Sequence, residues 1–359
     1  MASKKIDLPP GVLQPREAVL AMAPYNPPTS GRNDKLRLDF NENTVGASPN
    51  VIEYLREHLT ESGLAVYPEY DEIRPELADF FGVQADEFTL TNGTDEAIQV
   101  LVNTYVDAGD EVLLLAPSYA MYRFYSEVAG AIVREVPYRA EKLAFPLEEL
   151  LDEIRPRTRA ILIANPNNPT GTGTSRAGIE KILARATNAA VLVDEAYYEF
   201  SGVTALSLLD DYPNLFVSRT FSKVYGMAAM RLGCLFSQSG NVEFLRKAQS
   251  PYSVNSVAVL AARAAIRDQA YIQKYVMEVL AARELLYVGL EKLGVPYYPS
   301  QANFVLFQAG RRAIEIRDAL RRRGVLVRDR SYELEGCVRV TVGTREQMRR
   351  FLADLEEIW

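Results

Sequence analysis

The chain has 359 residues, 48% of them apolar and 24% charged, a composition typical of a globular protein with one large or two ordinary domains. Its net charge of -7 argues against a dedicated nucleic-acid-binding protein, which usually presents a basic face. The single histidine, His58, leaves too few ligands for a three-histidine zinc site or an HExxH motif, so we expect no metal centre. Two cysteines cannot form a disulfide framework, which favours a reducing, cytoplasmic location.

No apolar run suggests a signal peptide at the start of the chain, and none reaches the roughly 18 residues of a membrane helix. We therefore expect no membrane association. The first 36 residues are rich in proline and glycine, and we expect them to form an extended arm that contacts a small domain and a dimer partner.

Short apolar runs alternate with amphipathic stretches between about residues 85 and 240. This alternation predicts βαβ units and a mostly parallel sheet covered by helices on both faces. The predicted helices include residues 95–106 and 176–186, and the predicted strands are residues 88–91, 111–115, 132–136, 160–164, 190–193 and 215–218.

The pattern changes after about residue 241. A long helix is predicted at residues 269–293, followed by strands at 303–308 and 338–342 with helices around them. The fold class is therefore α/β, with a large domain at residues 37–245 and a smaller α+β domain at 246–359. The arm at residues 1–36 precedes both.

Polar residues follow five of the predicted strands. Ligands of open α/β sheets bind at the carboxyl ends of the strands, so these residues should meet at one edge of the sheet. They include Asn92 to Asp95, Tyr119, the loop NPNNPTG at 165–171, Asp194 with Tyr197, and Ser222, Lys223 and Arg231.

Each of these features has an ordinary structural explanation taken alone. Gly93-Thr94-Asp95 can simply begin a helix, the proline-rich loop can be a turn, and a lysine is usually a surface charge. Together they match the needs of pyridoxal 5'-phosphate. This cofactor requires a lysine for its aldehyde, a carboxylate for its ring nitrogen, a donor for its ring hydroxyl, a stacking aromatic ring and an anion site.

The chain resembles the fold-type I aminotransferases over nearly its whole length. The strings FSKVYGMAAMRLG at 221–233, NPNNPTG and DEAYYEF at 194–200 carry this resemblance. Within that family it is most similar to histidinol-phosphate aminotransferases, because of LDFNEN at 38–43, VYPEY at 66–70, TNGTDEAI at 91–98, PSYAMY at 117–122 and VRVTVGTREQ at 338–347.

The resemblance implies a pyridoxal-phosphate enzyme with a seven-stranded-type sheet in its large domain. Lys223, Asp194 and Tyr197 would be catalytic: Lys223 would bind the cofactor's aldehyde and move a proton, Asp194 would keep the ring nitrogen protonated, and Tyr197 would donate to the ring hydroxyl. The cofactor would also contact Gly93, Thr94, Asp95, Tyr119, Asn168, Ser222 and Arg231.

The resemblance also implies a homodimer in which Tyr67 reaches the other subunit's cofactor. The substrate would contact Arg339, Arg328, Asn303, Tyr25 and Asn43. The implied reaction converts histidinol phosphate and 2-oxoglutarate into imidazole acetol phosphate and glutamate, in histidine biosynthesis.

Two features leave other substrates open. The stretch between Arg328 and Arg339 is short and carries Asp329, Glu333 and Glu335, which would disfavour a phosphate if they pointed inward. The chain is also rich in tyrosine, so an aromatic amino-acid aminotransferase or a phosphothreonine decarboxylase of the same superfamily remains an alternative. A non-catalytic regulator on this fold is disfavoured because no basic extension for binding DNA is present.

Overall fold

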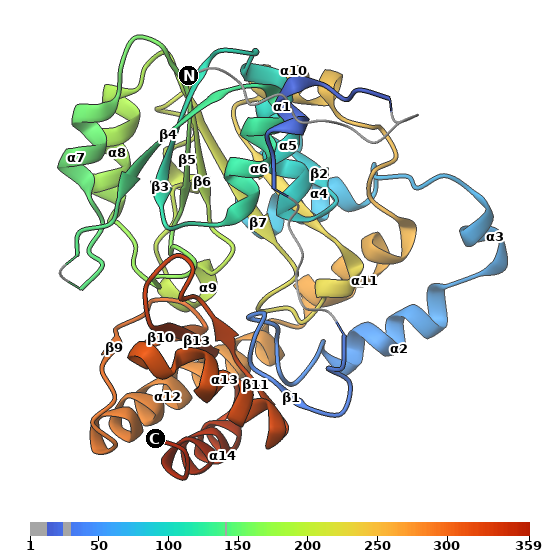
Figure 1. Ribbon diagram of the computed structural model, residues 1–359. Coiled ribbons are helices and arrows are strands. Elements are labelled where there is room, and N and C mark those ends of the chain that lie inside the picture. Colours follow the sequence, from blue (N-terminus) through green and yellow to red (C-terminus); the bar gives the residue numbers. More distant parts are fainter. Residues whose placement is uncertain (1–12, 24–29, 141) are drawn as a thin grey trace.

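The computed structural model describes residues 13–23, 30–140 and 142–359. The larger part of the molecule is built around a seven-stranded sheet of order β2-β8-β7-β6-β5-β3-β4 (Figure 1). Only β8 runs antiparallel to its neighbours. Its strands are β2 (Phe88–Thr91), β3 (Glu111–Ala116), β4 (Ile132–Pro137), β5 (Thr158–Ala164), β6 (Ala190–Asp194), β7 (Leu215–Thr220) and β8 (Gly233–Phe236).

Two hydrophobic clusters cover the two faces of this sheet. Leu113 and Leu115 of β3 belong to one cluster, whereas Val112 and Leu114 belong to the other, as the alternation of side chains along a strand requires. The first cluster includes the apolar face of α8 (Arg176–Arg185). The second includes those of α5 (Gly93–Tyr105) and α10 (Ser239–Ala248). The predicted helix-covered α/β sheet is therefore confirmed.

A second, antiparallel sheet of order β12-β13-β10-β9 lies in the C-terminal part of the chain, drawn in orange and red in Figure 1. Its strands are β9 (Tyr297–Tyr298), β10 (Phe304–Gln308), β12 (Arg328–Asp329) and β13 (Cys337–Thr341). The surrounding helices are α12 (Gln269–Lys292), α13 (Ala313–Arg322) and α14 (Arg345–Glu356), and α14 begins with a capping box between Thr344 and Gln347.

The described N-terminal residues lie in two places. Arg16, which precedes α1 (Glu17–Leu20), donates to the Val128 carbonyl of α6 (Ala120–Ala129). The strand β1 (Leu36–Arg37) instead pairs in parallel with β11 (Val325–Leu326), beside the C-terminal sheet. The remaining helices are α2 (Pro49–His58), α3 (Glu61–Ala65), α4 (Ile73–Phe81), α7 (Leu147–Glu153), α9 (Tyr198–Ser201) and α11 (Ser256–Arg267).

In the central sheet, the predicted elements differ from the structure mainly at their ends and at one strand; the two-residue strands β1, β9, β11 and β12 were not predicted. The sequence pattern identifies six of the seven central strands but not β8, whose four residues come directly after a short 3-10 turn at Ala228–Met230. The helix predicted from residue 95 begins two residues earlier, at Gly93. Within the described residues, no helix is both long and apolar enough to cross a bilayer.

Candidate active site

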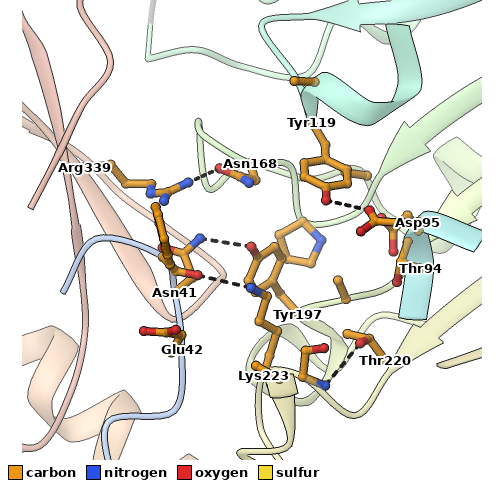
Figure 2. A pocket seen from close by; sticks show the side chains of 18 of the residues that line it. Asn41, Glu42, Thr94, Asp95, Tyr119, Asn168, Tyr197, Thr220, Lys223 and Arg339 are labelled. Carbon is orange, nitrogen blue, oxygen red and sulfur yellow. Dashed lines mark hydrogen bonds between the residues drawn. The ribbon is translucent and has the colours of Figure 1, made fainter. Parts of the chain in front are cut away.

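A cavity of about 560 Å³ lies at the carboxyl ends of the central strands, between the two sheets (Figure 2). Its lining contains most of the residues that the sequence pattern indicated or that the resemblance implied. These are Thr94, Asp95, Tyr119, Asn168, Asp194, Tyr197, Ser222, Lys223, Arg231, Arg328 and Arg339. The parallel strands bring residues from positions 94 to 231 to one edge, as expected for this type of sheet.

Lys223 is half-buried and projects into the cavity. Its Nζ donates to the Phe40 carbonyl at 3.2 Å and lies 5.8 Å from the centre of the Tyr197 ring. No carboxylate in the described part of the chain lies within ion-pair distance of this amine. It is therefore held by a neutral acceptor, and an incoming aldehyde need not displace an ion-pair partner to reach it.

Asp194 ends strand β6 and is 4% exposed. Tyr122 donates to its Oδ2 at 2.7 Å and Ser218 donates to its Oδ1 at 2.9 Å. Burial raises the pKa of Asp194 to about 6, although both hydrogen bonds act in the opposite direction. A cationic ring nitrogen beside this carboxylate would compensate for its burial.

Tyr197 lines the same cavity as Asp194, and its hydroxyl accepts a hydrogen bond from Asn41 Nδ2 at 2.9 Å. Asn41 has a left-handed backbone (φ 57°), which is uncommon for a residue other than glycine. Its Oδ1 accepts from Thr341 at 3.2 Å, so Asn41 links the central sheet to strand β13.

The segment 39–42 supplies acceptors to both main cations of the site. The Asp39 carbonyl accepts from Arg339 Nη2 at 2.7 Å, and the next carbonyl, Phe40, accepts from Lys223. This segment runs between the two sheets, and it contributes mostly through its backbone and through Asn41.

The end of the cavity that lies away from Arg339, at Thr94 and Asp95, has the properties of a phosphate site (Figure 2). Thr94 lies in the first turn of α5, and its Oγ1 is buried without a hydrogen-bond partner in the described structure. Arg231 approaches Gly93 so closely that a Cβ added there would lie 2.5 Å from Nη2. The φ of 73° at Gly93 also favours glycine. An unpartnered hydroxyl, an arginine and a helix N-terminus fit a phosphate group.

Asp95 partly neutralises this end of the cavity. It accepts from Tyr119 Oη at 2.7 Å and from Arg231 Nη2 at 3.2 Å. Tyr119 therefore has its ring in the cavity wall and its hydroxyl anchored on α5, an arrangement that suits a ring used for stacking.

Three arginines form the remaining wall: Arg328 of β12, Arg330 just after that strand, and Arg339 of β13. Arg339 is 4% exposed, and burial, together with Arg330 and Arg328, lowers its pKa to about 10. Its Nη1 donates to Asn168 Oδ1, while its Nε has no partner in the described structure. An anion entering this wall would meet unused donors.

Besides Gly93, which lies behind Arg231, three predicted residues of the described chain do not line this cavity. Asn43 is buried, and its side chain donates to Val224 and accepts from the backbone of residues 45 and 46, so it stabilises a turn. Asn303 donates to the Asn41 carbonyl from a fully buried position. Tyr67 is 73% exposed and stacks on Tyr252. Tyr25 lies outside the described residues.

The acids between Arg328 and Arg339 do not line the cavity. Glu333 pairs with Arg330, and Asp329 accepts from Ser331 at 2.6 Å. These carboxylates are therefore engaged within their own turn and do not oppose an anion in the cavity.

Several lining residues were not identified from the sequence as site residues. They are Asn41, Tyr122 and Arg330, and the first two act through contacts between segments distant in the chain. The sequence contains one usable signal: Arg330 lies two positions after Arg328, as expected for side chains on one side of an extended segment.

Comparison with known proteins agrees with this geometry. Residues 33–355 match the family described as aminotransferase class I and II. The chain belongs to this family. It is 39% identical to a histidinol-phosphate aminotransferase of Symbiobacterium thermophilum, over 95% of this chain and 97% of that one. It is 37% identical to a histidinol-phosphate aminotransferase of Thermococcus gammatolerans, over 95% and 96% of the two chains.

Solved structures show the same fold. The histidinol-phosphate aminotransferase of Sinorhizobium meliloti, solved with pyridoxal-5'-phosphate, matches with a TM-score of 0.86 and 25% identity, over 95% of this chain and 96% of that one. A single mutant of Thermus thermophilus aspartate aminotransferase matches with a TM-score of 0.84 at 24% identity, over 97% and 100% of the chains, which supports the fold alone.

Proposed function

We propose that this chain is a pyridoxal-phosphate-dependent histidinol-phosphate aminotransferase, using 2-oxoglutarate as acceptor. The observation that carries the proposal is the arrangement of Lys223, Asp194 and the Gly93–Arg231 anion site around one cavity. When bound, the cofactor supplies an electron-withdrawing ring that stabilises negative charge on the substrate α-carbon.

The side chains that line the cavity would each have a separate role in binding the cofactor or moving the proton. Lys223 would bind the cofactor's aldehyde, and its amine would later act as the base that moves the α-proton. Asp194 would hold the proton on the ring nitrogen. Tyr197 would donate to the ring hydroxyl together with Asn168, and Tyr119 would stack on the ring. The phosphate would be held by Thr94, Ser222, Arg231 and the backbone of residues 93–95.

The charge of the cavity supports a doubly anionic substrate. Five lysine and arginine side chains and three acidic side chains line it: Lys223, Arg231, Arg328, Arg330 and Arg339 against Glu42, Asp95 and Asp194. One of these acids, Glu42, is already paired with Arg32 at 2.7 Å. The names of the relatives point to the same substrate.

The substrate proposal predicts an order of activities. With 2-oxoglutarate as acceptor, we expect kcat/KM for histidinol phosphate to exceed that for phenylalanine and tyrosine, because its doubly charged phosphate can engage more of the arginine wall than the single carboxylate of the aromatic donors. Side-by-side steady-state kinetics would measure this order. A preference for the aromatic donors would leave the aminotransferase chemistry in place and favour the alternative aromatic enzyme. Decarboxylation of phosphothreonine would favour the other alternative.

Replacing Arg339 with lysine should raise KM for both substrates about 10- to 100-fold, with a smaller effect on kcat, because lysine cannot form a two-pronged contact with a carboxylate or phosphate. Steady-state kinetics in each half-reaction would measure the change. Arg345→Lys is a matched control, since Arg345 is exposed and paired with Glu278 in the same part of the chain. An unchanged KM for both substrates would contradict the assignment.

We also propose a cytoplasmic homodimer with three chain regions: an arm at residues 1–36, a large domain at 37–245 and a small domain at 246–359. The exposed, stacked pair Tyr67 and Tyr252 supports a contact with a second copy, where Tyr67 would reach the partner's cofactor. The positions of the two sheets support the domain division.

A further inference from the structure

A second cavity, of about 150 Å³, lies outside the active site. It is formed by α4, strand β2, the last turn of α10 and the segment that follows α10. None of its lining residues lines the active-site cavity. The lining comprises Tyr70, Arg74, Thr89, Leu90, Arg246, Gln249, Ser250, Pro251 and Ser253.

Two arginines face this cavity and no acid does. Arg74 and Arg246 come from helices far apart in the sequence, and no carboxylate of the described chain lies within ion-pair distance of either. The Nε atoms of both are buried without a hydrogen-bond partner. Arg246 has one acceptor, the Phe88 carbonyl at 3.1 Å, whereas the Arg74 guanidinium has no hydrogen bond within the described residues.

This arrangement is unfavourable without a counter-ion. Two partly buried like charges repel each other, and donors removed from water without partners cost free energy. Burial and the charge of Arg74 lower the pKa of Arg246, and Asp86 and Glu243 oppose the shift only in part.

The other polar groups of the cavity are neutral and mostly satisfied. Gln249 accepts from Thr89 at 2.7 Å and donates to the Leu90 carbonyl at 2.7 Å. Tyr70 both donates to and accepts from the backbone of Val254. The unused hydrogen-bonding capacity of the pocket therefore lies mainly on the two guanidinium groups.

We propose that this cavity binds one small oxyanion of the phosphate or sulfate class. A doubly charged tetrahedral anion would neutralise both arginines and accept from both Nε–H groups, whereas a carboxylate carries one charge for two cations. This site is independent of the proposed catalytic function, so either can fail without the other.

The experiment measures thermal unfolding of the holoenzyme in sodium phosphate and in sodium chloride of equal ionic strength. We expect Tm of the wild-type protein to rise by about 2 °C more in phosphate than in chloride, because a ligand that binds the folded state stabilises it. Arg74→Gln should lose most of this difference. It should be at least as stable as the wild type in chloride, since the repulsion between the arginines is removed.

Lys247→Gln is the matched control, because it removes a positive charge from α10 beside Arg246 without lining the cavity. Lys247→Gln should keep the full difference in Tm between phosphate and chloride. Arg339→Gln should keep it too, because Arg339 lines the active site and not this second cavity. Arg74→Gln is preferred to Arg246→Gln because it breaks no hydrogen bond. A phosphate effect that is absent from the wild type, or unchanged in Arg74→Gln, would overturn the proposal.

Discussion

Replacing Lys223 with alanine should lower the transamination rate by about 10⁴-fold or more, because the substitution removes both the nucleophile for the cofactor and the base for the α-proton. The position of Lys223 explains the size of this effect. Among the lysines of the described chain, it alone lines the active-site cavity, so none of the others lies where it could replace the lost amine. Steady-state turnover and the mass of the protein after borohydride reduction would measure the loss.

The control for this experiment is Lys292→Ala, which removes an exposed lysine at the end of α12. After borohydride treatment, the wild type and this control should both gain the mass of the cofactor, and Lys223→Ala should not. A Lys223→Ala enzyme with the wild-type rate would show that the assigned chemistry is wrong.

Replacing Asp194 with asparagine should lower kcat about 10²- to 10³-fold, while affinity for the cofactor changes much less. Asparagine keeps the shape of the side chain but removes the charge that favours a protonated ring nitrogen. The phosphate contacts at Thr94 and Arg231 remain, so docking should persist. Measurements of kcat and of cofactor affinity would separate the two effects, with Asp211→Asn as the exposed control.

The cofactor-free protein offers an independent test of the same residue. The pKa of Asp194 is raised from 3.8 to about 6, so the folded state binds this proton more tightly than the unfolded state. The resulting stability is fully present below pH 3.8 and is lost as pH rises through about 6. Denaturant titrations should show the wild type losing stability relative to Asp194→Asn over this range. An equal loss in both would contradict the pKa assignment.

Much of the fold could be predicted because buried parallel strands appear in the sequence as short, continuous apolar runs. The same regularity placed Asp194 and Lys223 just beyond strand ends. The strand β8 was missed because it has only four residues and follows closely on the 3-10 turn at Ala228–Met230, so its apolar run is too short to stand out.

The end of the cavity at the arginine wall, where the substrate is proposed to bind, was harder to predict because its geometry depends on contacts between distant segments. Asn43 belongs to the motif LDFNEN, but its side chain accepts hydrogen bonds within a local turn. Asn41, two residues earlier, instead has a left-handed backbone, and its side chain donates to Tyr197. Tyr122 becomes a site residue only because α6 brings its hydroxyl to Asp194 at the end of β6. Arg330 becomes one only because the C-terminal sheet lies across the cavity from the central sheet. Sequence spacing alone cannot show which member of a motif points inward.

The backbone segment 39–42 has a consequence for attempts to redesign this enzyme. Its carbonyls hold Lys223 and Arg339, so the cofactor end and the substrate end share one stretch of main chain. Exchanging the Phe40 side chain changes the cavity wall and the ring contacts of Arg32 and Arg328 but leaves the two carbonyls in place, whereas inserting or deleting a single residue shifts both carbonyls at once. Loop grafting to alter substrate choice is therefore better directed to the turn at residues 330–336, which leaves this shared main chain intact.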